Sequence, residues 1–252
     1  MNRLMNMIAP AALIIGVFVF WELFCIFADI SSLVLPRPTE IIATLIAYAP
    51  AIWPHTWQTL YTTMVGFFFG VMIGLSLGVV IGSSKLAFRT AYPLLVGISS
   101  IPKVAVVPIF VLWFGAGTVP AILTAMIICI FPIVVNVATG IATVEPELED
   151  VMRSLKATRR EILWNVGLPR AMPYFFASLK VAITLAFVGS VIAETVASNK
   201  GVGNMMLIAS STFNVPLVFA GLFVLAAMGI VLYAIFSLIE RRVCGWAMRK
   251  DF

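Results

Sequence analysis

The sequence has little charge and few side chains that could do acid–base chemistry. Only 11% of its 252 residues are charged, and it contains one His and three Cys. One histidine cannot build a zinc site, and no H-E-x-x-H pair is present. Cys25, Cys129 and Cys244 have no metal-ligand spacing and are expected to be small packing residues. The sequence therefore predicts no metal site and no catalytic residue. Nor does it contain a G-x-x-x-x-G-K-[ST] phosphate-binding loop, so this chain is not expected to bind a nucleotide cofactor.

What the chain has in excess is hydrophobic side chains. They make up 62% of the sequence, and the mean hydropathy is +1.10. A soluble domain could not place so many on its surface, which predicts an all-α integral membrane protein forming a single domain over residues 1–252. About six segments are long enough to cross the hydrocarbon layer as helices. They lie near residues 8–28, 58–82, 91–114, 119–141, 172–194 and 216–239.

The basic residues predict the orientation of these spans. Twelve of the sixteen lie on one side, which is expected to be the cytoplasm together with both termini. They are Arg3, Lys85, Arg89, Arg153, Lys156, Arg159, Arg160, Arg170, Arg241, Arg242, Arg249 and Lys250. The opposite side has only Arg37 and Lys200. This bias accounts for the net charge of +5, so no nucleic-acid partner is needed to explain it. The first segment follows Arg3 and lacks a small-residue cleavage site, which favours a retained span over a signal peptide.

Glycine spacing in the second span predicts close helix packing. Glycine occurs at every fourth position, at Gly66, Gly70, Gly74, Gly78 and Gly82. These positions form one stripe on a helix and allow another backbone to approach closely.

The third and fifth spans contain the polar groups that could border a solute path. Pro102 and Pro108 remove backbone donors and should break or bend the third span, and Lys103 lies between them. The Lys103 ammonium could face a path or snorkel to the headgroups. Ser190 and Glu194 end the fifth span, and the carboxylate near a helix C-terminus requires a specific partner. Both charges could instead be structural.

The polar stretch between the fourth and fifth spans, residues 145–161, concentrates charge in an otherwise apolar chain. Leu148, Met152 and Leu155 recur at helical spacing, and the pattern continues to Ile162 and Val166. This pattern predicts a short amphipathic helix on the cytoplasmic side, with an apolar ridge available to a partner. An ordinary solvated loop helix is the alternative.

The stretch from Asp150 to Pro169 resembles the cytoplasmic loop of permease subunits of ATP-binding-cassette importers, with its E-A-A…G…I…L-P signature. Ile-Pro-Lys-Val-Ala at 101–105, Leu-Trp-Phe-Gly at 112–115, Ala193-Glu194 and Gly-Val-Gly at 201–203 are similar to the branch that serves nitrate, taurine, alkanesulfonates and thiamine pyrimidine precursors. Asp150 replaces the glutamate of the signature, and Lys156 replaces its glycine.

The resemblance implies a permease core at about residues 55–240 in a bacterial cytoplasmic membrane. It implies a homodimer in lipid, two cytoplasmic ATP-binding subunits that hold ATP and Mg, and an external solute-binding protein. The residues expected to couple to the ATPase are Leu148, Asp150, Val151, Met152, Arg153, Ser154, Leu155, Lys156, Ala157, Thr158, Gly167 and Pro169. Those expected along the translocation pathway are Pro102, Lys103, Pro108, Ser190 and Glu194.

Two other classes remain open at the level of sequence. An intramembrane enzyme would have to use Glu22, Glu194 and His55. A passive channel would not need the cytoplasmic ridge. For a transporter, Lys103 favours a small organic or oxo-anion as substrate, with a thiamine pyrimidine precursor or related heterocycle as the alternative.

Overall fold

The computed structural model describes residues 2–246, and every regular element in that range is a helix. Arg249 and Lys250, two of the basic residues used to predict orientation, lie outside the described residues. In chain order the elements are α1 (Asn2–Phe27), α2 (Pro38–Ala47), α3 (Ala49–Gly82), α4 (Lys85–Ser99), the 3₁₀ turn η1 (Lys103–Val106), α5 (Val107–Phe114), α6 (Thr118–Ala142), α7 (Pro146–Ser154), α8 (Arg159–Ile162), the π-helical η2 (Leu163–Gly167), α9 (Leu168–Ala197), α10 (Val202–Ser211) and α11 (Val215–Val243).

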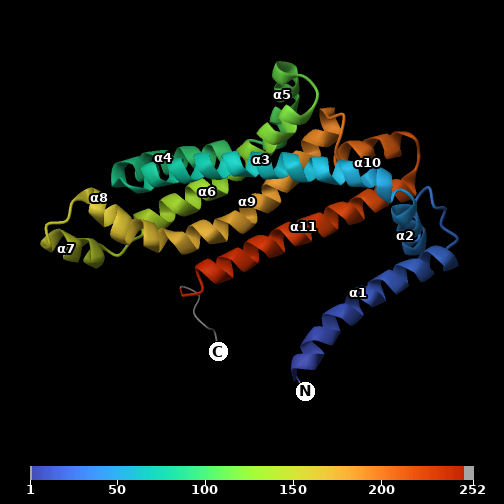
Figure 1. Cartoon of the computed structure of the whole chain (residues 1–252), viewed down its shortest axis with the longest axis horizontal. Coiled ribbons are helices and arrows are strands. Elements are labelled where there is room, and N and C mark those ends of the chain that lie inside the picture. The colour runs from blue at the N-terminus through green and yellow to red at the C-terminus, as the bar shows by residue number, and fades with distance from the viewer. Residues whose placement is uncertain (1, 247–252) are drawn as a thin grey trace.

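The long helices α3, α6, α9 and α11 run along the long axis of the molecule (Figure 1). Helices α7 and α8 lie at one end of this bundle, and α2 and α10 lie at the other. Helix α1 diverges from the bundle, and α5 projects from its side. The two ends of the bundle are therefore built from different short helices.

The glycine stripe of α3 packs directly against α6, which confirms the prediction of close packing. A Cβ added to Gly74 would lie 2.9 Å from Cβ of Ile133, and one added to Gly78 would lie 2.7 Å from Cβ of Val137. Both distances are shorter than any real Cβ contact allows, so a side chain at either position would force the helices apart. The partner face of α6 is also buried and repeats every fourth residue, at Ala121, Ala125, Cys129, Ile133, Val137 and Ile141.

Helix α6 is covered on its other side by α9. Gly140 lets the two backbones approach, since a Cβ there would lie 3.0 Å from Cα of Ala171. The core between these helices consists of small and branched apolar residues, and Phe67 extends it to α11 by an edge-on contact with Phe236, 4.9 Å between ring centroids. Lipid tails are as apolar as the helix surfaces, so the hydrophobic effect does not drive helices together within a membrane. Dense packing of this kind stabilises their association instead.

The predicted spans agree with the structure in four cases and differ in two. Helices α3, α6, α9 and α11 are long and apolar enough to cross a membrane. The predicted span at 91–114 is not one helix, because α4 and the η1–α5 segment meet at an angle of 76°. In α1 the described apolar part, Ala12–Phe27, is shorter than a full span. The described residues thus contain four spans, or five with the bent pair, and the exact count of six is not confirmed.

Two ionisable side chains of the long helices have specific partners on other helices. The Lys180 ammonium forms an ion pair at 2.5 Å with Glu240 of α11, and both side chains are largely buried. The ammonium is therefore paired with a carboxylate of α11 within the bundle. Glu22 of α1 accepts hydrogen bonds from the backbone amide of Thr39 at 3.1 Å and from its hydroxyl at 2.8 Å, which joins α1 to the first turn of α2.

Candidate functional site

The polar stretch between α6 and α9 folds as two short helices, although the apolar periodicity predicted one. Helix α7 begins at Pro146, a residue suited to the first turn of a helix, and ends at Ser154. Lys156 has a φ of +60°, which no helix continues through. The apolar pattern that runs on to Ile162 and Val166 therefore belongs to a second helical segment.

Lys156, which replaces the glycine of the signature that this loop resembles, forms the turn at the end of α7. Its amide donates to the carbonyl of Arg153 at 2.9 Å, and the amide of Ala157 donates to that of Met152 at 3.0 Å. These two bonds close the end of α7 in the way that a glycine usually allows. A lysine in this left-handed conformation costs about 1 kcal/mol. The replacement noted in the sequence thus strains the turn but does not lengthen the helix.

Thr158 begins the second short helix, α8, through a reciprocal cap with Glu161. Its hydroxyl accepts from the amide of Glu161 at 3.3 Å, and the Glu161 carboxylate accepts from the Thr158 amide at 2.7 Å. This capping box satisfies two backbone donors that a helix start leaves free. The direction of the chain after the strained turn is therefore fixed by side-chain bonds.

An apolar ridge is exposed on α7, although its members differ from those the spacing suggested. Val151 and Leu155 are 57% and 73% exposed, whereas Leu148 and Met152 are half-buried against the chain itself. Around this ridge Asp150 and Ser154 are solvated; Asp150 lies 4.0 Å from Arg153, and the Ser154 hydroxyl donates to the carbonyl of Val151. Val151 and Leu155 therefore form the exposed apolar surface at the end of α7, the Val151–Leu155 ridge.

The α8 helix passes into the fifth span without a break. The π-helical turn Leu163–Gly167 joins α8 to α9, and the three elements together run as one helix from Arg159 to Ala197. Gly167 is buried, with Leu163 3.1 Å from where a Cβ would lie. Pro169 follows the π-helical turn, and because proline has no N–H it cannot donate to a carbonyl of that turn. The second half of the polar loop is therefore continuous with a membrane-spanning helix.

At the opposite end of this helix, Glu194 is fully buried, with an exposed fraction of 0%. Its Oε2 accepts from the hydroxyl of Thr59 at 2.7 Å and from the amide of Gly203 at 3.3 Å, and its Oε1 lies 3.1 Å from the hydroxyl of Thr62. Ser190 and Thr62 are 2.5 Å apart, so Ser190 can donate to Thr62 while Thr62 donates to the carboxylate. The prediction that Glu194 has a specific structural partner is confirmed.

The Gly-Val-Gly segment wraps around this carboxylate. Gly201 has a φ of +117°, and a Cβ at this position would overlap the Glu194 carboxylate. The amide of Val202 donates to Thr59 at 2.9 Å, and the amide of Gly201 donates to Nδ1 of His55 at 3.1 Å. The first turn of α10 is therefore fastened to α3 and α9 together. His55 is half-buried and joins α3 to this segment.

Thr59 and Thr62 are site residues that the sequence alone did not identify. The available signal was their position, since Thr62 and Thr59 lie one and two turns before Gly66 and continue the glycine stripe of α3. A hydroxyl on the packed face of an apolar helix requires a partner, and here the partner is Glu194.

The break in the third span lies at Pro102, between the end of α4 and the start of η1. The Lys103 ammonium donates to the carbonyl of Ser99 at 3.0 Å and lies 5.4 Å from the ring centroid of Phe131. The ammonium therefore supplies a hydrogen-bond donor to a backbone carbonyl that the broken helix leaves without one. Pro108 lies in the first turn of α5, where it does not disturb hydrogen bonding.

The structure brings the broken span close to the fifth span, but the two charges do not form an ion pair. Val107, at the start of α5, packs with Ala121 and Ala193 in one buried cluster. Ser190 and Glu194 instead bond to α3. Within residues 2–246, Lys103 has no carboxylate partner.

The comparisons with known proteins agree with this architecture. Residues 70–244 match the family described as "Binding-protein-dependent transport system inner membrane component", and the chain belongs to that family. It is a membrane-embedded permease subunit of a transporter and not an enzyme.

Two relatives illustrate the range of the family. The chain is 34% identical over 230 residues to the riboflavin transport system permease protein RibX of Chloroflexus aurantiacus, covering 90% of this chain and 86% of that protein. It is 27% identical over 251 residues to the formylaminopyrimidine transport permease protein ThiX of Halalkalibacterium halodurans, covering 99% and 100%. Among solved structures, an inward-facing conformation of the MetNI methionine ABC transporter superimposes with a TM-score of 0.67 at 22% identity, over 77% of this chain and 98% of that one, which supports the fold.

Proposed function

We propose that two copies of this chain form the translocation pathway of an ATP-driven importer in a bacterial cytoplasmic membrane. Two cytoplasmic ATPase subunits, which hold ATP and Mg, dock on the α7–α8 loops, and a solute-binding protein delivers substrate to the other side. Both termini lie in the cytoplasm in this arrangement. Membership of the permease family supports the partners in general terms, and the basic residues of the loops support the orientation.

One observation carries the coupling role. The exposed Val151–Leu155 ridge lies at one end of a continuous helix, and the Glu194 carboxylate lies near the other end. A partner that binds the ridge therefore holds a direct mechanical connection to the segment that fastens α10. From Ala171 to Phe187 the connection runs through packed helix, since these residues of α9 belong to the buried core shared with α6.

The mechanism follows from this geometry. When the ATPases close on nucleotide, they shift the two α7–α8 loops, and α8, η2 and α9 move as a unit. The shift changes the position of Ser190 and Glu194 relative to Thr59 and Thr62 of α3. Since the Glu194 bonds also hold the first turn of α10, they anchor the outer gate, which opens or closes with them.

The broken third span is proposed to border the pathway. The break at Pro102 and the η1 turn that precedes Pro108 leave irregular backbone at membrane depth, which lipid tolerates only beside protein or a water-lined cavity, and Lys103 gives this place a positive charge. The substrate best suited to a positive path is a small organic or oxo-anion. A heterocycle is the second candidate, because RibX and ThiX are named as transporters of riboflavin and formylaminopyrimidine.

Leu155→Asp tests the coupling role. It places a charge in the ridge, and a dry contact with the ATPase would be weakened by several kcal/mol. We expect uptake to vanish and the ATPase to be lost on purification, while the permease still inserts at normal abundance. Leu33→Asp is the matched control, because Leu33 is 64% exposed in the loop between α1 and α2. Helix α2 lies at the opposite end of the bundle from α7 (Figure 1).

Retained substrate-stimulated ATP hydrolysis in Leu155→Asp would refute the docking role of the ridge. Equal loss in both variants would show that an added charge harms the permease wherever it is placed.

A further inference from the structure

A cavity of about 680 Å³ opens at the end of the bundle where the α7–α8 loop meets α3 and α6. Its walls include Gly82 and Ala142, the last residues of α3 and α6, so its floor lies where the membrane-spanning part of both helices stops. Because these helices cross the hydrocarbon layer, the cavity lies at the depth of the lipid headgroups.

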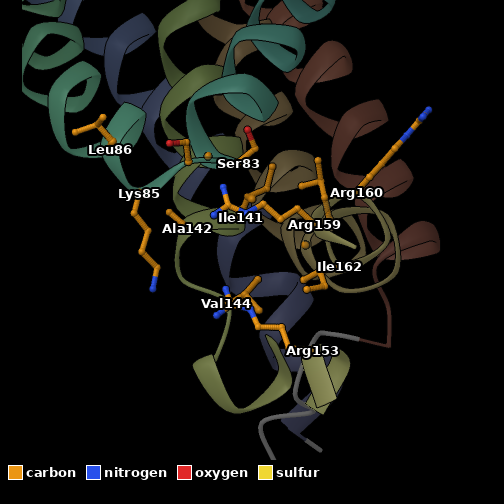
Figure 2. A pocket seen from close by; sticks show the side chains of 14 residues that line it. Ser83, Lys85, Leu86, Ile141, Ala142, Val144, Arg153, Arg159, Arg160 and Ile162 are labelled. Atoms are coloured by element: carbon orange, nitrogen blue, oxygen red, sulfur yellow. The ribbon is translucent and has the colours of Figure 1, made fainter. Parts of the chain in front are cut away.

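The charged side chains that line this cavity are all basic. They are Lys85, Arg153, Arg159 and Arg160, and no Asp or Glu is among the described residues that line it. Figure 2 shows Arg160 extending away from the other three, which leaves Lys85, Arg153 and Arg159 as the cations of the cavity. The positive charge therefore comes from three separate elements, α4, α7 and α8.

Two of these cations are uncommitted within the described chain. Ion pairs involve Arg153, Arg170 and Lys180, but none among residues 2–246 involves Lys85 or Arg159. Like charges gathered around a cavity repel one another, and a bound anion relieves that repulsion. A guanidinium and an ammonium are the groups that proteins use to bind phosphate.

Apolar walls flank the cations. Leu86 is 74% exposed at the rim beside Lys85, and Ile162 and Leu163 are half-buried on the opposite wall. A free, fully hydrated oxyanion gains nothing from these walls. A glycerophosphate whose acyl chains continue into the bilayer would use both the cations and the apolar sides.

We propose that this cavity binds the phosphate headgroup of an anionic phospholipid. The choice of the cytoplasmic leaflet rests on the orientation proposed above, whereas lipid binding itself does not. The bound lipid bridges the α3–α4 turn and α8, and so holds the polar loop against the bundle. The site is distinct from the Val151–Leu155 ridge, which faces the partner.

Native mass spectrometry of the purified full-length chain in detergent, titrated with dioleoyl-phosphatidylglycerol or dioleoyl-phosphatidylcholine, tests this proposal. We expect the anionic lipid to bind at least about tenfold more tightly, and the double variant Lys85→Gln with Arg159→Gln to lose about thirtyfold, or about fivefold for each charge. The charge-matched control, Arg241→Gln with Arg242→Gln at the exposed end of α11, should change binding less than about twofold, since it removes no cation from the cavity.

Several results would overturn the proposal. Equal binding of the two lipids, or equal losses in the two double variants, would show attraction to net charge alone. Full displacement of the lipid by excess inorganic phosphate would make this a site for a free anion. Exclusion of the lipid from the complex with the ATPase would make the cavity a contact for that protein. If the double Gln variant fails to fold, Lys85→Arg with Arg159→Lys must retain lipid binding. The lipid and phosphate comparisons need no variant, and none of these measurements depends on transport.

Discussion

At the scale of single residues, the most demanding group is the Glu194 carboxylate. A carboxylate with no exposed surface is unfavourable unless hydrogen bonds replace its hydration. Here two threonine hydroxyls and a backbone amide supply them, and no basic side chain among the described residues does. Thr59 is central, because its hydroxyl donates to Glu194 and also accepts from the amide of Val202.

Thr59→Val keeps the shape of this side chain and removes both bonds. We expect the folded permease to lose about 2 kcal/mol of stability, because Oε2 of Glu194 and the amide of Val202 lose their partners in a buried site. The measurement is thermal or denaturant unfolding in detergent. Thr59→Ser keeps the hydroxyl and should lose less than half as much. If Val and Ser behave alike, the hydroxyl has no part in holding α10.

The sequence predicted only part of the hydrogen-bonded cluster around Glu194. A carboxylate near the C-terminus of an apolar helix must have a partner, and that much followed from Glu194 alone. The identity of the partners did not, because Thr59 and Thr62 lie more than a hundred residues earlier and only the packing of α3 on α9 brings them near. In the same way, nothing in the composition near Lys156 indicated that a lysine forms a left-handed turn.

At the scale of elements, the spacing of residues correctly predicted which face of a helix is packed, but it did not predict where a helix ends. The glycine stripe of α3 identified a packed face because four-residue spacing keeps a position on one side of a helix. It did not identify α6 as the partner. The apolar spacing of the polar loop continued through the turn at Lys156, so it joined α7 and α8 into one helix. When a turn separates two helices but the apolar residues keep their helical spacing across it, as at Lys156, the spacing alone cannot reveal the turn.

The broken third span provides the test of the pathway at this scale. Lys103→Met keeps the stem of the side chain and removes the charge that sits at the break. If the break borders the path of an anion, uptake should fall about tenfold or more while membrane abundance is unchanged, since the path loses its positive potential. Lys200→Met, which removes an exposed lysine outside the spans, is the control.

Unchanged uptake in Lys103→Met would remove Lys103 from the path. Loss of the folded protein, with normal abundance of Lys200→Met, would assign the ammonium to the Ser99 carbonyl as a structural bond.

At the scale of the whole molecule, hydropathy and spacing predicted a helical membrane protein, and the motifs predicted its family. The number of spans was less accessible, because hydropathy measures how apolar a segment is and not whether it stays straight. The single-domain description and the core at about residues 55–240 remain predictions.

Orientation is a property of the whole chain and is tested by labelling. All three native cysteines are buried, so an introduced cysteine reports its own position. A membrane-impermeant maleimide added to intact cells should label Asn199→Cys, in the exposed α9–α10 loop, and should not label Ser154→Cys on α7. Permeabilised cells should label both. The reverse pattern would place the α7–α8 loop outside and end the argument for ATPase docking.

The uninterrupted helix from Arg159 to Ala197 has a thermodynamic consequence. At 39 residues it spans roughly 58 Å, from the polar loop to the cluster that fastens α10. If both ends bias the same two positions of this rod, their binding energies are linked, and the linkage is reciprocal. Suppose that nucleotide on the ATPase changes the affinity of the outer face for its delivery protein by some factor. The delivery protein then changes the affinity for nucleotide, on the far side of the membrane, by the same factor. The signal that cargo is present outside and the signal that ATP is bound inside would be one coupling free energy, read from opposite ends of α9.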